Sequence, residues 1–265
     1  MERFFKLRGE LPKSTATVIF YAGLAILVFL WWAITAFTHI SPTLLPSPGK
    51  VLMSFKELHL EDALVRNTIY SVRLNLLGYI EAIAVALPIG FIIGLFPFFR
   101  DMFRRHLDAI RFIPLTAVTG LFIAWFGIED NMKVQFLACG IIVYLLPVVV
   151  QRIQEVDDVY VQTIQTLSIH QWHIIKKVFI PAVLSKVYED IRVLVAISWT
   201  YIIVAEMVNK SGGIGAMAYL AARQSRVDKV FALLVVIILI GIIQDKLFML
   251  LDRILFPYKY KKEKV

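Results

Sequence analysis

Six apolar stretches dominate the chain, and each is long enough, or nearly so, to cross the hydrocarbon core of a bilayer as a helix. Residues 17–37 contain no charged residue over 21 positions, which corresponds to about 31 Å of α-helix. Because backbone N–H and C=O groups must be hydrogen-bonded inside lipid, such stretches fold as helices. The predicted spans are residues 17–37, 74–99, 112–128, 134–150, 193–208 and 230–251.

The composition agrees with a polytopic membrane protein rather than a soluble one. Hydrophobic residues make up 59% of the 265 positions and charged residues 18%. The sequence contains no low-complexity tract and no convincing tandem repeat, so we expect one all-α transmembrane domain over residues 1–265. The single cysteine, Cys139, excludes an internal disulfide.

The distribution of basic residues predicts the orientation. With the N-terminus inside, the inside segments are residues 1–16, 100–111, 151–192 and 252–265, and they contain 18 Lys and Arg, against nine in the outside segments. This bias follows the positive-inside rule, so both termini are predicted to be cytoplasmic. It also accounts for the net charge of +8 without a nucleic-acid partner.

A polar, amphipathic insert at residues 161–181 separates two apolar stretches, within a predicted cytoplasmic loop of residues 152–192. Its apolar side chains recur at helical spacing on both sides of a break. Ser168 followed by Gln171 has the pattern of a capping box, and Leu167 with Trp172 can form a hydrophobic staple across it. The insert is therefore predicted to form two short helices that meet at a corner, a surface that another protein can bind.

Motifs for chemistry are absent. The sequence has no P-loop pattern, so the chain is not expected to bind ATP by that route, and it has neither H-E-x-x-H nor G-x-S-x-G. The glycine-rich residues 211–215 lack the P-loop lysine and are predicted to form a turn. His170 and His173 have helical spacing but no carboxylate or cysteine nearby, so we expect no metal site. The chain is not expected to be an enzyme.

Several motifs resemble those of the permease subunits of binding-protein-dependent ABC importers, in the branch that serves nitrate, sulfonates and taurine. They lie in the family's order along the chain: LPSP at residues 45–48, WFGI at residues 125–128 followed by Lys133, and VAEM at residues 204–207 followed by SGGIG at residues 211–215. The resemblance covers roughly residues 15 to 257.

The insert resembles the cytoplasmic coupling loop of these permeases. The family's Glu-Ala-Ala is replaced here by residues 162–164 (QTI) and its glycine by Ser168, while Pro181 keeps its spacing from Ser168. The resemblance assigns ATPase coupling to residues of this insert. They are Gln162, Thr163, Ile164, Leu167, Ser168, Trp172 and Pro181.

The resemblance implies the type I ABC importer fold with six transmembrane helices in a bacterial inner membrane. It implies a second permease copy, ATPase subunits that bind ATP and Mg²⁺, and a periplasmic or lipid-anchored solute-binding protein. The substrate implied is a small polar solute, most often an anion such as a sulfonate, taurine, nitrate or bicarbonate, although some relatives look like vitamin-precursor transporters. This chain itself is expected to bind no cofactor.

Two alternatives remain open at this point. The first is a secondary transporter or channel that needs no ATPase, for which Glu81 and Glu206 are the candidate intramembrane ion sites. The second is a structural or signalling subunit, suggested by the replaced Glu-Ala-Ala and Gly residues. Glu206 is a candidate for the translocation path or, equally, a residue solvated at the outer interface. For Glu81, a structural partner on another span is favoured over a place in the path.

Overall fold

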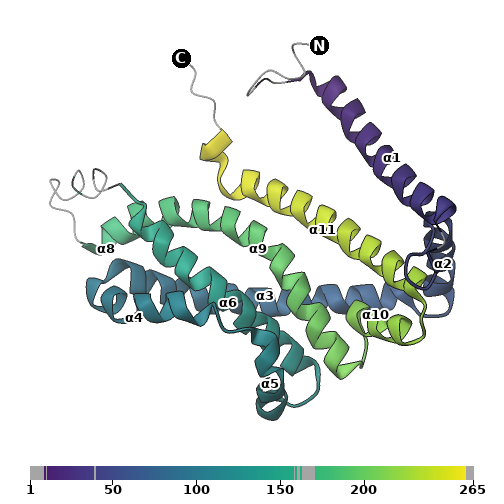
Figure 1. The fold of residues 1–265 in the computed structure, drawn as a ribbon. Coiled ribbons are helices and arrows are strands. Elements are labelled where there is room, and N and C mark those ends of the chain that lie inside the picture. The colour runs from purple at the N-terminus through teal and green to yellow at the C-terminus, as the bar shows by residue number, and fades with distance from the viewer. Residues whose placement is uncertain are drawn as a thin grey trace. The chain divides into compact units, whose positions relative to one another are not determined.

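The computed structural model describes residues 9, 11–38, 40–157, 159, 162 and 171–260. These residues form helices and connecting turns, with no β-strand among them (Figure 1). The helices belong to two compact units, the first comprising residues 1–63 and 220–234 and the second residues 64–219 and 235–265. Within this described part of the chain, five helices are long and apolar enough to span a membrane, and a bent helix pair can supply a sixth span.

The first unit contains α1 (Lys13–Phe37), α2 (Pro48–Leu60) and the beginning of α11 (Val227–Leu255). The helix α1 has no buried residue within the structure, as expected for a helix that faces lipid or another subunit. Its Trp31 donates a hydrogen bond of 3.0 Å from Nε1 to the carbonyl oxygen of Pro46 and lies against Phe231. These contacts join α1, the turn before α2 and the start of α11.

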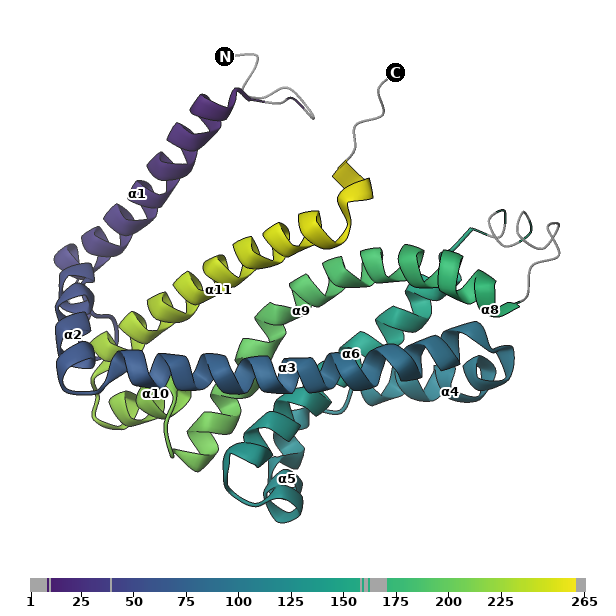
Figure 2. The ribbon, with the colours of Figure 1, turned by 180° about the vertical axis from the view of Figure 1, so that it is seen from behind.

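The second unit is built on α3 (Leu64–Leu95), α6 (Asp130–Gln154) and α9 (Ile180–Asn209), with α6 packed against both of the others (Figure 2). Two glycines of α3 allow close contact with α6. A Cβ atom added at Gly90 would lie 2.6 Å from Val149, and one added at Gly94 would lie 2.6 Å from Ile153. The G-x-x-x-G pattern therefore serves packing within the chain.

The predicted third span, residues 112–128, does not form a single straight helix. The structure has the amphipathic α4 (Pro97–Ile110), then the short 3₁₀-helix η1 (Leu115–Val118) and α5 (Thr119–Phe126), bent by 87° from α4. Pro114 directly precedes η1, which agrees with the low tendency of proline to continue a helix. Phe122 of α5 packs on Phe136 of α6, with ring centroids 5.3 Å apart.

Much of the predicted loop 152–192 is helical. The short α8 (Gln171–Ile174) continues through a π-helical turn, η2 (Ile175–Phe179), into α9. Pro181 has no N–H to donate to the carbonyl group four residues earlier, and the wider π-turn comes directly before it. The helical segment that includes the span thus extends from Trp172 to Val208, instead of starting at residue 193.

The chain continues through α10 (Ile214–Arg223), α11 and the short 3₁₀-helix η3 (Pro257–Tyr260). In the second unit, the far part of α11 is joined to α9 by an ion pair, in which Arg192 Nε lies 2.5 Å from Asp245 Oδ1 and Arg192 Nη2 lies 2.9 Å from Asp245 Oδ2. Charges that suggest a loop in the sequence are thus paired between helices.

Candidate functional site

The described part of the coupling insert presents an exposed groove at the start of the long helical segment. Trp172 is 62% exposed, and Lys176, Lys177 and Pro181 are also exposed. Together with His173, these side chains line an open depression of about 710 Å³. A large exposed aromatic side chain is a common anchor of a protein-binding surface.

The C-terminal helix η3 holds the beginning of α9. The hydroxyl group of Tyr258 donates to the carbonyl oxygen of Pro181 at 3.1 Å, and Lys259 Nζ donates to the carbonyl oxygen of Ser185 at 2.6 Å. Lys259 also lies 3.0 Å from Glu189 Oε1 and 3.2 Å from Asp252 Oδ1. The groove is therefore attached to a braced helix, and no sequence motif identified these contacts.

The end of α6 is linked to α9 by a two-point ion pair. Arg152 Nε lies 2.7 Å from Asp190 Oδ2, and Arg152 Nη2 lies 2.8 Å from Asp190 Oδ1. Arg152 Nη1 also donates to Glu155 at 2.7 Å, and this hydrogen bond holds the pKa of Glu155 below its usual range. The two-point geometry fixes direction as well as distance between the end of α6 and the beginning of α9.

A second region is a buried polar cluster around Glu206. Its side chain is 0% exposed and accepts hydrogen bonds from Ser71 Oγ at 2.6 Å and from the backbone N–H of Gly215 at 2.8 Å. Two further N–H groups at the start of α10 are also satisfied: that of Gly213 donates to Asn67 Oδ1 and that of Ile214 to Ser71 Oγ, each at 2.8 Å. A carboxylate at a helix N-terminus is favoured by the local dipole, so Glu206 caps α10.

The turn before α10 depends on glycine. Gly212 has φ +145° and Gly213 has φ +95°, values that side chains other than glycine rarely adopt. A Cβ atom at Gly213 would also collide with the carboxyl group of Glu206. The SGGIG motif therefore forms a turn, as predicted, and brings three N–H groups onto side chains of α3 and α9.

Lys133 supplies a buried cation to the same cluster. The side chain is 0% exposed, and its Nζ atom donates to the hydroxyl oxygens of Tyr70 at 2.8 Å and Ser211 at 2.7 Å. Asp130 Oδ1 lies 3.8 Å from the same Nζ atom and accepts a hydrogen bond from Tyr70. Burial of a charge is unfavourable unless it is paired and hydrogen-bonded, and these partners provide that compensation.

The family model described as the binding-protein-dependent transport system inner membrane component matches residues 86–256, well over half of the chain. The chain belongs to this family. The matched residues include α5, α6, the whole insert of residues 161–181 and the turn after Glu206, whereas Asn67, Ser71 and the helix η3 lie outside the match.

Two similar proteins match the permease over nearly its whole length. The putative aliphatic sulfonates transport permease protein SsuC of Bacillus subtilis (strain 168) is 29% identical, over 96% of this chain and 97% of the relative. The taurine transport system permease protein TauC of Escherichia coli (strain K12) is 24% identical, over 96% of this chain and 94% of the relative.

Solved structures share the fold at low sequence identity. A chain of the MetNI methionine ABC transporter in an inward-facing conformation has a TM-score of 0.64 at 14% identity, covering 72% of the permease and 94% of that chain. A chain of an amino acid ABC transporter crystallised with histidines has a TM-score of 0.57 at 16% identity, covering 76% and 96%. The predicted fold, an all-α type I ABC importer permease, is confirmed.

The structure describes only some of the residues that the sequence assigned to coupling. Trp172 and Pro181 line the same groove, and Gln162 is exposed. Thr163, Ile164, Leu167 and Ser168 lie outside the described residues, and so does the predicted corner between the two helices. The coupling role of these residues stays a prediction.

The two candidate residues of the translocation path have different surroundings. The alternative in which Glu206 is solvated at an interface is wrong, because the side chain is fully buried and its carboxylate oxygens are hydrogen-bonded. Glu81 is exposed on α3 and accepts a hydrogen bond of 2.7 Å from Gln135 on α6, a structural partner on another span. A role in the path stays a prediction for both.

Proposed function

We propose that this permease forms a homodimer in a bacterial inner membrane, with both termini in the cytoplasm, and provides the path for a small organic anion of the sulfonate or taurine type. The relatives named for aliphatic sulfonates and taurine, which match the chain from end to end, support this substrate class. A periplasmic or lipid-anchored binding protein delivers the solute. Nitrate and bicarbonate are anions of the same branch and are the next candidates.

The permease couples to a separate cytoplasmic ATPase, which binds ATP and Mg²⁺ and performs the hydrolysis. One observation carries this part of the proposal: the exposed groove at Trp172 belongs to the same helical segment, Trp172–Val208, that is apolar enough to cross the membrane. A partner that holds the groove can displace this helix. The ion pair between Arg152 and Asp190 then transmits the displacement to α6.

The buried cluster favours this proposal over a transporter that needs no ATPase. Such a transporter requires intramembrane carboxylates that are available to bind an ion. The carboxylate of Glu206 is already hydrogen-bonded by Ser71 and by the N–H group of Gly215, and Glu81 is bonded by Gln135. A structural subunit without transport has no need of an exposed aromatic and basic groove at the end of a span.

The first experiment is affinity purification of the tagged permease from native membranes in mild detergent, followed by mass spectrometry. We expect a P-loop ATPase in near-stoichiometric amount. If the permease is recovered intact and folded without an ATPase, the coupling proposal fails, and the structural or ATPase-independent alternatives replace it.

A variant pair then tests the groove itself. Lys177→Glu reverses one charge inside the groove, whereas Lys56→Glu makes the same change at an exposed lysine of α2, outside the groove. We expect Lys177→Glu to reduce ATPase recovery by about tenfold, since a charge reversal at an interface changes binding by roughly 1–2 kcal/mol. Equal recovery with the two variants would locate coupling elsewhere.

A further inference from the structure

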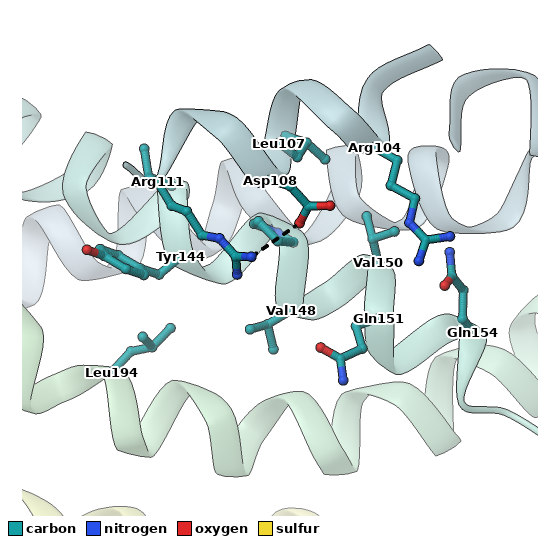
Figure 3. Close-up of a pocket in the computed structure, with 12 residues that line it drawn as sticks. Arg104, Leu107, Asp108, Arg111, Tyr144, Val148, Val150, Gln151, Gln154 and Leu194 are labelled. Atoms are coloured by element: carbon teal, nitrogen blue, oxygen red, sulfur yellow. Dashed lines mark ion pairs between the residues drawn. The ribbon is translucent and has the colours of Figure 1, made fainter. Parts of the chain in front are cut away.

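A polar cavity of about 390 Å³ lies between α4, α6 and the Leu194 position of α9. Figure 3 shows Arg104 of α4 and Arg111, which directly follows the last residue of α4, with their guanidinium groups directed toward α6. Because they are seven positions apart, about two helical turns, both side chains lie on the same side of α4. Polar groups on the facing side come from Tyr144, Gln151 and Gln154 of α6.

The charges that line this cavity suit a monoanion. Asp108 Oδ1 lies 3.7 Å from Arg111 Nη2 and offsets one of the two positive charges. Arg104 has no ion pair or hydrogen bond with any other residue that the structure describes, and its guanidinium group is left to face the cavity. The Gln151 amide is engaged, since its Nε2 donates to Glu155 Oε1 at 3.0 Å. One uncompensated arginine together with the amide group of Gln154 matches an anion with a single charge and several oxygen acceptors.

An apolar cavity of about 230 Å³ adjoins the polar one, and Arg111, Val143 and Tyr144 line both. Away from these shared residues, its walls are mainly aliphatic and aromatic. They include Val118, Leu121, Phe122, Trp125 and Tyr201. A ligand that occupied both cavities would meet a cationic half and an apolar half, and the two volumes taken together fall within the range typical for small-molecule sites.

We propose that the two cavities form a binding site for an alkyl sulfonate within the permease. This proposal rests on the proposed function, because it names a site for the proposed substrate. The sulfonate group lies between Arg104 and Arg111, and the alkyl chain extends past Tyr144 toward Phe122. A sulfonate carries one charge and three acceptor oxygens, which fits the polar half. A dianion such as sulfate lacks the alkyl group and carries one charge too many for the single uncompensated arginine.

Cys139 provides a native reporter of this site. It is the single cysteine of the chain and lines the apolar cavity. In the full-length permease reconstituted in phosphatidylcholine nanodiscs, the rate of modification by neutral methyl methanethiosulfonate is measured with 1-hexanesulfonate, ethanesulfonate, sulfate or hexyltrimethylammonium added. We expect 1-hexanesulfonate to protect Cys139 at a concentration at least about tenfold lower than ethanesulfonate, since each buried methylene favours binding. Sulfate and the cation should not protect.

Arginine variants separate a specific site from general partitioning. We expect Arg104→Gln and Arg111→Gln to raise the half-protecting concentration of 1-hexanesulfonate by about tenfold each. Arg105→Gln removes the same charge at the neighbouring position of α4, which does not line the cavity, and should leave protection unchanged. The rate of Cys139 modification without added ligand shows whether the cavity of each variant is still folded. Half-protecting concentrations are compared only among variants whose rate equals that of the unmodified sequence.

Three results would overturn the site. The first is that hexyltrimethylammonium protects Cys139 as well as 1-hexanesulfonate does, and the second is that 1-hexanesulfonate protects Cys139 equally in the Arg104→Gln and Arg105→Gln variants. The third is that Cys139 is protected only when the nanodisc contains anionic lipid. The last result would assign the cavity to a lipid headgroup. Uptake of ethanesulfonate by cells that carry the complete transporter is measured separately. Uptake without Cys139 protection rejects the site and keeps the proposed function, whereas protection without uptake or a co-purified ATPase rejects the proposed function.

Discussion

The Glu206 cluster and the Trp172 groove stand in contrast within the same helical segment. At the Glu206 end, a carboxylate, a lysine and three backbone N–H groups are buried and hydrogen-bonded. At the Trp172 end, aromatic and cationic side chains are exposed around an open groove. The first arrangement fixes the helix to α3 and α10, and the second leaves the other end available to a partner.

This contrast shows which residues determine stability and which determine binding. A buried charge network loses much of its stabilisation when one member is removed, because the remaining charges have no partner. An exposed side chain contributes little to folding and acts mainly on the partner that it contacts. Substitutions in the two regions should therefore separate unfolding from uncoupling.

The largest loss of stability is expected for Glu206→Ala. The change leaves the N–H group of Gly215 and the hydroxyl group of Ser71 without their acceptor and removes a buried negative charge near Lys133, which corresponds to about 3–5 kcal/mol. The melting temperature of the detergent-solubilised permease should fall by at least about 5 °C. Glu81→Ala, at an exposed carboxylate, is the control and should change it by less than about 2 °C. Similar losses in both variants would contradict the capping role of Glu206.

A smaller loss is expected for Gly213→Ala. The substitution places a side chain at φ +95° and against the Glu206 carboxyl group, and the strain amounts to about 1–3 kcal/mol. Gly241→Ala is the matched control, because a Cβ atom at Gly241 meets nothing within 4 Å in a helical segment. The control should leave the melting temperature unchanged or raise it slightly. A tolerated Gly213→Ala would mean that the turn adapts without loss of the cap.

The sequence predicts the helical class and most of the spans because apolar length is a local property. It also predicts the SGGIG turn, since a cluster of glycines is typical of turns. It does not identify Ser71 as the partner of Glu206, or Asn67 as the acceptor of the Gly213 N–H group, because these residues lie 135 and 146 positions earlier than their partners and stand in no recognisable motif. Lys133 is visible in the WFGI…K pattern, but its burial depends on the packing of α6 against α3.

Two boundaries also follow from packing rather than from local pattern. The charges of residues 186–192 indicate a loop when they are counted along the sequence, yet Asp190 and Arg192 are paired with Arg152 and Asp245 on neighbouring helices. The break at residues 112–114 depends on how α4 and α5 each pack against α6. Neither the ion pairs nor the helix break can be predicted from the sequence immediately around these residues, because both depend on helices that are distant in the sequence.

The smallest effect on stability is expected for Trp172→Asp. The side chain is 62% exposed, so the substitution removes little buried area and should change the melting temperature by less than about 2 °C. Recovery of the co-purified ATPase should nevertheless fall at least tenfold, because a large aromatic residue that lines a binding groove is a typical hot spot. Trp199→Phe gives the opposite pattern, since it removes the 2.6 Å hydrogen bond from the buried indole N–H to Gln244 while the groove stays intact. A clearly lower melting temperature of the Trp172→Asp variant would mean that this side chain, like the Glu206 cluster, stabilises the folded helix.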